Sequence, residues 1–104
     1  MKSDRFRAAA EAKDFEAGER LFAEHVVFRS PFVHKPYEGK AALLFLLGNV
    51  VQVLENFRYV SNVETGDTAV LLFEADVNGR QLQGVDILKF GEGDLITEMA
   101  VMAR

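Results

Sequence analysis

The chain has 104 residues, which is enough for one hydrophobic core, so we expect one domain over residues 1–104. Its formal net charge of −4 argues against nucleic acid or an anionic membrane as a partner, because both need a basic protein surface. The sequence has no cysteine, which excludes disulfides and thiolate chemistry.

The first part of the chain predicts two helices followed by a strand. The expected elements are a helix over residues 3–15, a shorter helix over 16–24, a strand over 26–30 and a loop over 31–39. The first helix is rich in alanine, and its spacing turns Phe6 inward. Ser30 ends the strand because it precedes a proline, which cannot donate to a β-ladder. The N-terminus lacks the apolar core of a signal peptide, so we expect a cytoplasmic protein.

The middle of the chain predicts one long helix and one strand. Residues 40–55 are apolar on nearly every side, which is typical of a helix that is buried on most of its surface. Residues 57–64 form a strand that turns through residues 65–67. A three-residue loop would turn Phe57, Tyr59, Ser61 and Val63 inward, whereas a two-residue loop would turn in Arg58, Val60 and Asn62. We favour the longer loop, because such hairpins often carry glycine at the left-handed position.

The last 38 residues, 67–104, organise the fold, since they read as three consecutive strands. Asn78-Gly79 is the preferred pair for a two-residue type I′ hairpin. The expected pairs are Val77 with Arg80, Ala75 with Leu82, Phe73 with Gly84, Leu71 with Asp86 and Ala69 with Leu88. This register turns Asp86 into an apolar face, and a slip by one residue would move it to the opposite face.

A second hairpin, through residues 91–94, adds the final strand. Its expected pairs are Phe90 with Leu95, Leu88 with Thr97, Asp86 with Met99 and Gly84 with Val101. The face around Asp86 then carries Ala69, Leu71, Phe73, Ala75, Leu82, Leu88, Phe90, Met99 and Val101. The other face carries an apolar patch formed by Val70, Leu72, Val85, Ile87, Ile96, Ala100 and Met102. Such a patch marks an interface, and we expect a homodimer through it.

This order of elements predicts an α+β fold, with N-terminal helices packed on a curved, mainly antiparallel sheet. The pattern resembles the nuclear-transport-factor-2-like superfamily of cone-shaped folds, which includes SnoaL-like proteins and ketosteroid isomerases. The segments that carry the resemblance, over nearly the whole chain, are residues 4–6, 13–15, 21–31, 37–41 and 84–90. The resemblance does not identify an activity, because proteins with this fold include isomerases, cyclases, epoxide hydrolases and binding proteins.

The resemblance to ketosteroid isomerases allows a comparison at three positions. Those enzymes use a tyrosine on the first helix, where this chain has Phe6, and an aspartate base before the proline, where it has Ser30. They keep a third residue, an aspartate, protonated in an apolar site, and Asp86 matches it. With two of three groups missing, the resemblance argues against steroid isomerisation by that mechanism. The Asp-Arg-Asp set of the epoxide hydrolases is also missing, since Glu74 and Asp76 fall on the outer face.

Asp86 is the strongest candidate for a functional residue. Apolar surroundings should raise the pKa of its carboxyl, and such a carboxyl in a cleft indicates function. Alternatively, Asp86 is a structural residue satisfied by Tyr59 or Thr97. His25 is expected at the surface, and the two histidines are too isolated for a metal site. We expect no metal and no cofactor.

We expect the helices and the sheet to enclose a mainly apolar pocket. Its predicted lining is Phe6, Phe28, Ser30, Phe32, His34, Tyr59, Phe73, Asp86, Met99 and Val101. Such a pocket suits a small, mostly apolar molecule whose polar group meets Asp86. One alternative is an isomerase, cyclase or hydrolase that uses Asp86 as acid or base, and another is a dimeric interaction module without catalysis.

Overall fold

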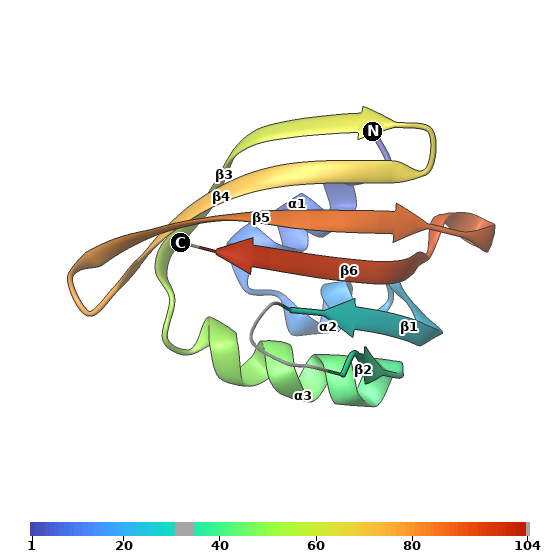
Figure 1. The fold of residues 1–104 in the computed structure, drawn as a ribbon, viewed down its shortest axis with the longest axis horizontal. Coiled ribbons are helices and arrows are strands. Elements are labelled where there is room, and N and C mark those ends of the chain that lie inside the picture. Colours follow the sequence, from blue (N-terminus) through green and yellow to red (C-terminus); the bar gives the residue numbers. More distant parts are fainter. Residues whose placement is uncertain (31–34, 104) are drawn as a thin grey trace.

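A curved six-stranded sheet covered by three helices on its inner side makes up the fold (Figure 1). The computed structural model describes residues 1–30 and 35–103. The elements are α1 (Asp4–Ala12), α2 (Phe15–Glu19), β1 (Phe22–Arg29), β2 (Tyr37–Glu38), α3 (Lys40–Val51), β3 (Glu55–Thr65), β4 (Thr68–Val77), β5 (Arg80–Phe90), the 3-10 turn η1 (Glu92–Asp94) and β6 (Ile96–Ala103). The strand order is β2-β1-β6-β5-β4-β3, antiparallel except between β1 and β6. The predicted α+β class is confirmed.

The N-terminal elements differ from the prediction. The first helix ends at Ala12 and not at residue 15, because Lys13 has a left-handed backbone conformation. The second helix ends at Glu19 and the first strand already begins at Phe22, so residues 22–24 are strand and not helix. Phe22 pairs in parallel with Ile96 of β6, and this tertiary pairing overrides the local helical pattern. The short strand β2, within the predicted loop, pairs with Val27 and Phe28 of β1. Of the predicted loop, residues 31–34 lie outside the described part.

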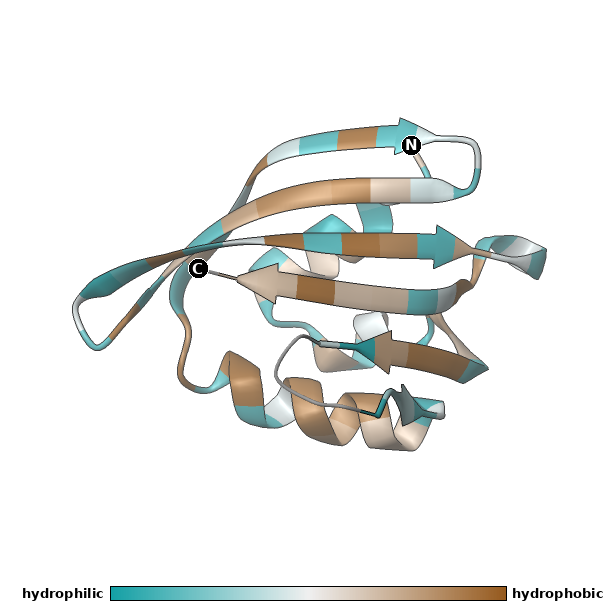
Figure 2. Ribbon diagram, viewed as in Figure 1, coloured by the Kyte–Doolittle hydropathy of each residue, from teal (hydrophilic) through white to brown (hydrophobic). Residues whose placement is uncertain are grey.

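Helix α3 is shorter and more exposed than predicted. It ends at Val51, and although Leu43 is fully buried, the side chain of Phe45 is 77% exposed. Figure 2 shows that apolar residues make up most of α3. The prediction of a helix buried on most sides is therefore wrong. The reason is that α3 packs at one edge of the sheet, mainly against β1 and β2.

In the β3–β4 hairpin, the side-chain directions expected for the two loop lengths both occur, each in a different part of β3. Thr65 pairs with Thr68, so the loop has two residues and the favoured three-residue loop is wrong. However, Ser61 pairs with Leu72 and Tyr59 with Phe73, which leaves Val60 as an extra residue in a β-bulge. Near the turn Asn62 therefore lies on the inner face, as a two-residue loop requires. Beyond the bulge, Tyr59 lies on the inner face, as the longer loop predicted.

The β4–β5 hairpin has the predicted register at every pair, including Leu71 with Asp86. Asn78 and Gly79 have φ angles of 51° and 79°, the two positive values that a type I′ turn requires. Consequently the inner face around Asp86 is as expected, and its carboxylate side chain is only 4% exposed. The central inference from the sequence is confirmed.

The β5–β6 hairpin is shifted by two residues from the predicted register. Asp86 pairs with Val101 and Leu88 with Met99, because the 3-10 turn lengthens the connection. A shift of two keeps each side chain on its predicted face, so the inward prediction for these four residues holds. A further irregularity beside Phe90 turns Ile96 inward, where it is fully buried. Its predicted place in the outer patch is wrong.

Candidate functional site

A mainly apolar cavity of about 140 Å³ lies between the helices and the inner face of the sheet. Its described lining is Phe6, Ala9, Ala10, Lys13, Asp14, Phe15, Gly18, Glu19, Phe22, Leu44, Leu47, Val50, Val51, Leu54, Phe57, Tyr59, Phe73, Asp86, Met99 and Val101. The charged members, apart from Asp86, come from α2 and the turn before it. The walls contributed by the sheet are otherwise aromatic and aliphatic.

One hydrogen-bonded pair supplies the polar chemistry of the sheet wall. The hydroxyl of Tyr59, on β3, donates to Oδ2 of Asp86, on β5, at 2.5 Å. Both side chains are buried, and the two residues come from strands that β4 separates. Of the two structural partners considered for Asp86, Tyr59 is the one that bonds it. Thr97 instead donates to the carbonyl of Lys89.

Burial dominates the electrostatics of this pair. It raises the pKa of the Asp86 carboxyl from an ordinary 3.8 to about 7, while the hydrogen bond from Tyr59 acts in the opposite direction. Burial also raises the pKa of the Tyr59 hydroxyl, followed by the nearby charge of Asp86. Asp86 can therefore hold or release a proton near neutral pH, whereas Tyr59 stays a hydrogen-bond donor. A neutral Asp86 can accept from Tyr59 at Oδ2 and donate to a ligand from its other oxygen.

Aromatic contacts hold the ring of Tyr59 in place. It meets Phe57 edge-on with ring centroids 5.0 Å apart, and Phe57 also packs against Phe73 at 5.2 Å. Phe6 of α1 contacts Tyr59 from the helical side at 6.2 Å. Such pairs stabilise specific ring orientations beyond the burial of their area. The tyrosine is thus fixed from both layers of the fold.

The predicted pocket residues fall into three groups. Phe6, Tyr59, Phe73, Asp86, Met99 and Val101 line the cavity. Phe28 is buried in the core and Ser30 is half-buried at the end of β1, and neither belongs to the described lining. Phe32 and His34 lie outside the described residues. That the lining residues bind a ligand stays a prediction.

Sequence reasoning missed the contribution of α3 to the cavity. Leu44, Leu47 and Val51 recur at the three- and four-residue spacing of one helix face, and all three line the cavity. This spacing was available in the sequence but was hidden by the uniformly apolar composition of the helix. The lining residues between α1 and α2, Lys13 and Asp14, carried no such periodic signal.

Lys13 connects the two helical walls of the cavity. Its ammonium donates to the carbonyls of Leu54, at 2.7 Å, and Val51, at 3.3 Å, where α3 has ended. Such a contact satisfies carbonyls that lack a partner within the helix. Lys13 itself has a left-handed backbone conformation at the end of α1. One side chain of the cavity lining therefore ties the end of α1 to the end of α3.

Two further observations concern possible metal ligands and the length of the helices. Within residues 1–30 and 35–103, no group of three or more potential ligands could hold a metal ion. His25 is exposed on β1. Across the same residues, no helix is both long and apolar enough to span a bilayer.

Comparisons with known proteins agree with this fold. A family model described as "SnoaL-like domain" matches residues 4–99. A steroid delta-isomerase from Pseudomonas aeruginosa has 32% identity and a TM-score of 0.90, covering 99% of this chain and 77% of that one. An uncharacterized protein with a cystatin-like fold from Silicibacter pomeroyi has 30% identity and a TM-score of 0.91, covering 99% and 73%. An NTF-2 like protein of unknown function from Burkholderia xenovorans, at 17% identity, 98% and 79% coverage and a TM-score of 0.86, shares the fold. No curated protein matches the chain.

Proposed function

We propose that this chain, which belongs to the SnoaL-like domain family, binds a small and mainly apolar molecule in its cavity. The observation that supports this most directly is a buried Tyr59–Asp86 pair set into an otherwise apolar sheet wall. Pockets of this kind use apolar walls for affinity and a few polar groups for orientation. The polar group of the ligand would therefore meet Asp86.

The cavity and its polar pair narrow the ligand class. A volume of about 140 Å³ is close to that of engineered cavities of about 150 Å³ that hold benzene, so a single-ring compound suits it. Because a protonated Asp86 can donate a hydrogen bond, a carbonyl oxygen is the matching acceptor. A four-ring steroid is larger than this volume and would have to extend beyond the cavity. We therefore favour single-ring ketones or aldehydes as the ligand class.

Binding of acetophenone, with ethylbenzene as the matched hydrocarbon, tests this proposal. We expect acetophenone to bind more tightly, and its affinity to fall as the pH rises through about 7, since Asp86 then loses its proton. Ethylbenzene should bind with little pH dependence. The binding of both compounds can be followed by NMR titration of the native protein and of Asp86→Asn. Equal pH profiles for both compounds, or no binding of either, would contradict the proposal.

A proton-transfer enzyme is the second candidate function. Two observations favour it: the pKa of Asp86 lies near 7, the optimum for acid–base work at neutral pH, and a 32%-identical structure is a steroid delta-isomerase. In such a step the Asp86 carboxylate would remove a proton from the carbon next to a carbonyl, leaving an enolate. Exchange of the methyl protons of acetophenone in D₂O, followed by NMR, measures this. Rates equal to those of Asp86→Asn would exclude the enzyme.

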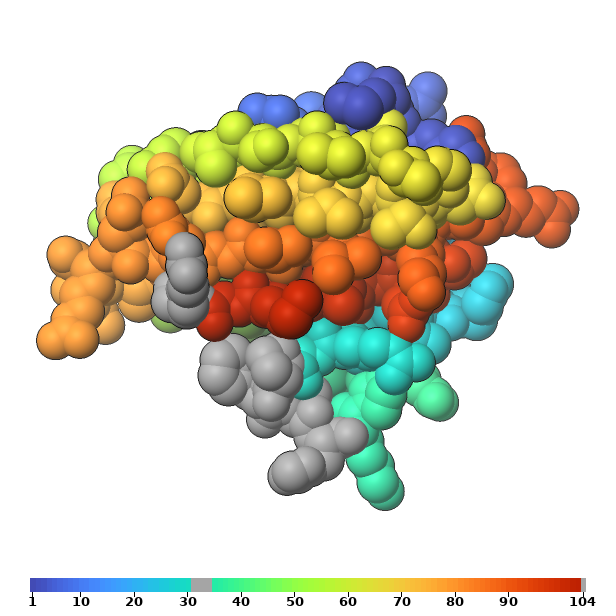
Figure 3. Space-filling model, turned by 45° about the horizontal axis from the view of Figure 1, so that its top comes forward, coloured from blue at the N-terminus to red at the C-terminus, as the bar shows by residue number. Residues whose placement is uncertain are grey.

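We further propose a homodimer through the outer face of the sheet. Exposed apolar side chains gather there, including Val60 and Val63 on β3, Leu72 on β4 and Met102 on β6. Figure 3 shows that β3, β4, β5 and β6 lie side by side across this face. A two-fold axis would bring the same patch of two copies together. An exposed patch of this kind is typical of an interface.

A further inference from the structure

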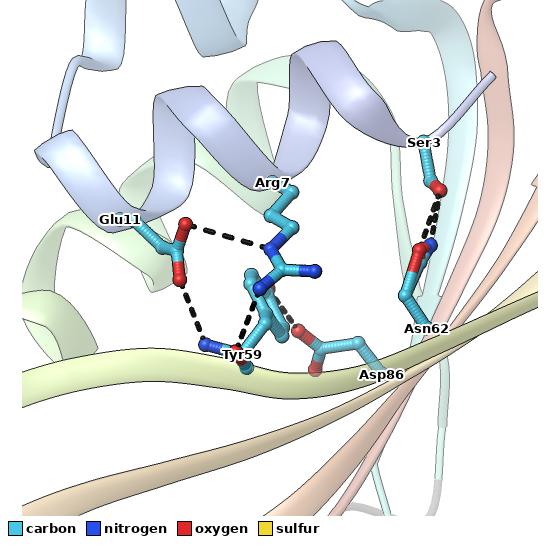
Figure 4. A network of polar contacts seen from close by, with 6 residues as sticks. All are labelled: Ser3, Arg7, Glu11, Tyr59, Asn62 and Asp86. Atoms are coloured by element: carbon cyan, nitrogen blue, oxygen red, sulfur yellow. Dashed lines mark hydrogen bonds and ion pairs between the residues drawn. The ribbon is translucent and has the colours of Figure 1, made fainter. Parts of the chain in front are cut away.

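Two side chains of α1 bind the backbone of Tyr59 from outside the sheet. The amide N–H of Tyr59 donates to Oε2 of Glu11 at 2.9 Å, and its carbonyl accepts from the guanidinium of Arg7 at 2.9 Å. The guanidinium Nε of Arg7 also lies 3.5 Å from Oε1 of Glu11. Figure 4 shows both side chains reaching the backbone of Tyr59 from α1, while the Tyr59 hydroxyl is joined to Asp86.

The position of Tyr59 explains why such contacts are needed. β3 is the last strand of the sheet, so one side of its backbone has no neighbouring strand. Arg7 and Glu11 are four residues apart and therefore neighbours on one face of α1. Together they offer one donor and one acceptor, as the backbone of a further strand would. At Tyr59, the pair thus makes the two backbone hydrogen bonds that a further strand would make.

This residue lies next to the bulge at Val60. The extra residue of a bulge changes which face of the sheet the side chains beyond it occupy, so the bulge determines which way the Tyr59 ring points. A slip of one residue would turn Tyr59 to the outer face and separate its hydroxyl from Asp86. The two contacts from α1 are made to the backbone in the register that points the ring inward.

We propose that Arg7 and Glu11 form a positioning pair that directs the Tyr59 hydroxyl toward Asp86. The pair touches neither the cavity nor Asp86, and it acts through the backbone of β3. Its importance for ligand binding rests on the proposed function, but the positioning itself can be measured without any ligand. A failure of acetophenone to bind would leave the pair's role intact.

The Asp86 carboxyl provides the readout. Burial raises its pKa and the hydrogen bond from Tyr59 lowers it, whereas Arg7 and Glu11 contact the Tyr59 backbone and each other. Both residues act on the pKa of the Tyr59 hydroxyl, which the charge of Glu11 raises and the charge of Arg7 lowers. A change in the Asp86 pKa after removal of the pair would therefore report movement of Tyr59.

Carboxyl-carbon NMR of ligand-free protein measures this pKa in four variants. Tyr59→Phe should raise the Asp86 pKa, because the hydrogen bond that lowers it is lost. The double variant Arg7→Ala/Glu11→Ala should raise it most of the way to the Tyr59→Phe value. Glu11→Gln should leave it near the native value, since the amide oxygen can still accept from the Tyr59 N–H. If the double variant does not fold, Glu11→Ala alone should give a rise of the same sign.

Ser3→Ala serves as the matched control. Ser3 also links α1 to β3, through Asn62 on the other side of the bulge, at 2.8 Å. Its removal should lower the melting temperature without moving the Asp86 pKa. The proposal is overturned if the alanine variants of the pair keep the native pKa, if Ser3→Ala raises it as much as they do, or if Tyr59→Phe does not raise it.

Discussion

Asp86 carries an energetic cost that a purely structural residue would not need. Its carboxyl is buried among apolar side chains, and one hydrogen bond from Tyr59 offsets only part of the loss of hydration. An asparagine could accept the same hydrogen bond without a charge at neutral pH. The presence of an acid at this position favours a role in binding or proton transfer over a role in stability.

The first prediction concerns the pH dependence of stability. The folded protein holds the Asp86 proton more tightly than the unfolded chain, so this residue favours folding at low pH, and its contribution declines from about pH 4 to about pH 7. A shift from 3.8 to about 7 corresponds to about 4 kcal/mol in the free energy of unfolding. We expect Asp86→Asn to remove this decline. Urea unfolding of both proteins at several pH values measures the difference, and parallel curves would disprove it.

At the scale of single elements, close packing between β4 and β5 shapes the cavity wall. Gly84 lies opposite Phe73, and a Cβ added at Gly84 would come within 2.2 Å of the Phe73 ring and 2.8 Å of the Met102 carbonyl oxygen. The missing side chain therefore makes room for the ring. Because Phe73 also contacts Phe57, this glycine helps to set the shape of the aromatic wall.

The second prediction is that Gly84→Ala damages both stability and the cavity. The methyl group should displace the Phe73 ring and cost about 1–3 kcal/mol, as overpacking does. Thermal unfolding gives the stability, and acetophenone titration reports whether the wall still has its shape. A variant with native stability and native binding would show that the ring moves freely.

The third prediction uses another glycine and has the opposite sign. Gly48 lies inside α3, and a Cβ there would meet nothing within 4 Å. Alanine is the better helix former, so Gly48→Ala should stabilise the protein by roughly 0.5–1 kcal/mol. Chemical denaturation under the conditions used for Gly84→Ala measures it. A loss of stability would mean that α3 packs more closely here than the structure shows.

At the scale of the whole molecule, the two faces of the sheet carry different kinds of side chain. The inner face holds the core and the Tyr59–Asp86 pair. The outer face combines exposed apolar side chains with ion pairs such as Arg58–Glu74 and Lys89–Glu98. Leu72 and Met102 are 40% and 50% exposed, and this exposure supports the proposed dimer interface.

The fourth prediction tests the assembly. Leu72→Arg should convert a dimer into a monomer, because it places a charge within the proposed apolar interface. The matched control is Phe45→Arg, which changes an exposed apolar residue on α3, away from this face, and should leave the mass unchanged. Sedimentation equilibrium at micromolar concentration distinguishes these states. A native protein that sediments as a monomer would rule out the homodimer.

Local signals in the sequence determined the centre of the fold. Asn78-Gly79 and the alternation on both sides of it are sufficient for the β4–β5 register, since a tight turn and a period of two are properties of neighbouring residues. The inward direction of Asp86 follows from them. For the same reason a two-residue error in the next hairpin left Met99 and Val101 on the correct face.

Tertiary packing decided the features that have no local signal. The bulges that turn Tyr59 and Ile96 inward arise where the strands bend around the core, and the sequence alone left both open or wrong. The early start of β1 depends on parallel pairing with β6, far along the chain. An acid facing an apolar interior could therefore be read from the sequence. Its partner stayed open between Tyr59 and Thr97, because Tyr59 reaches Asp86 only through contacts between distant strands and the helix that covers them.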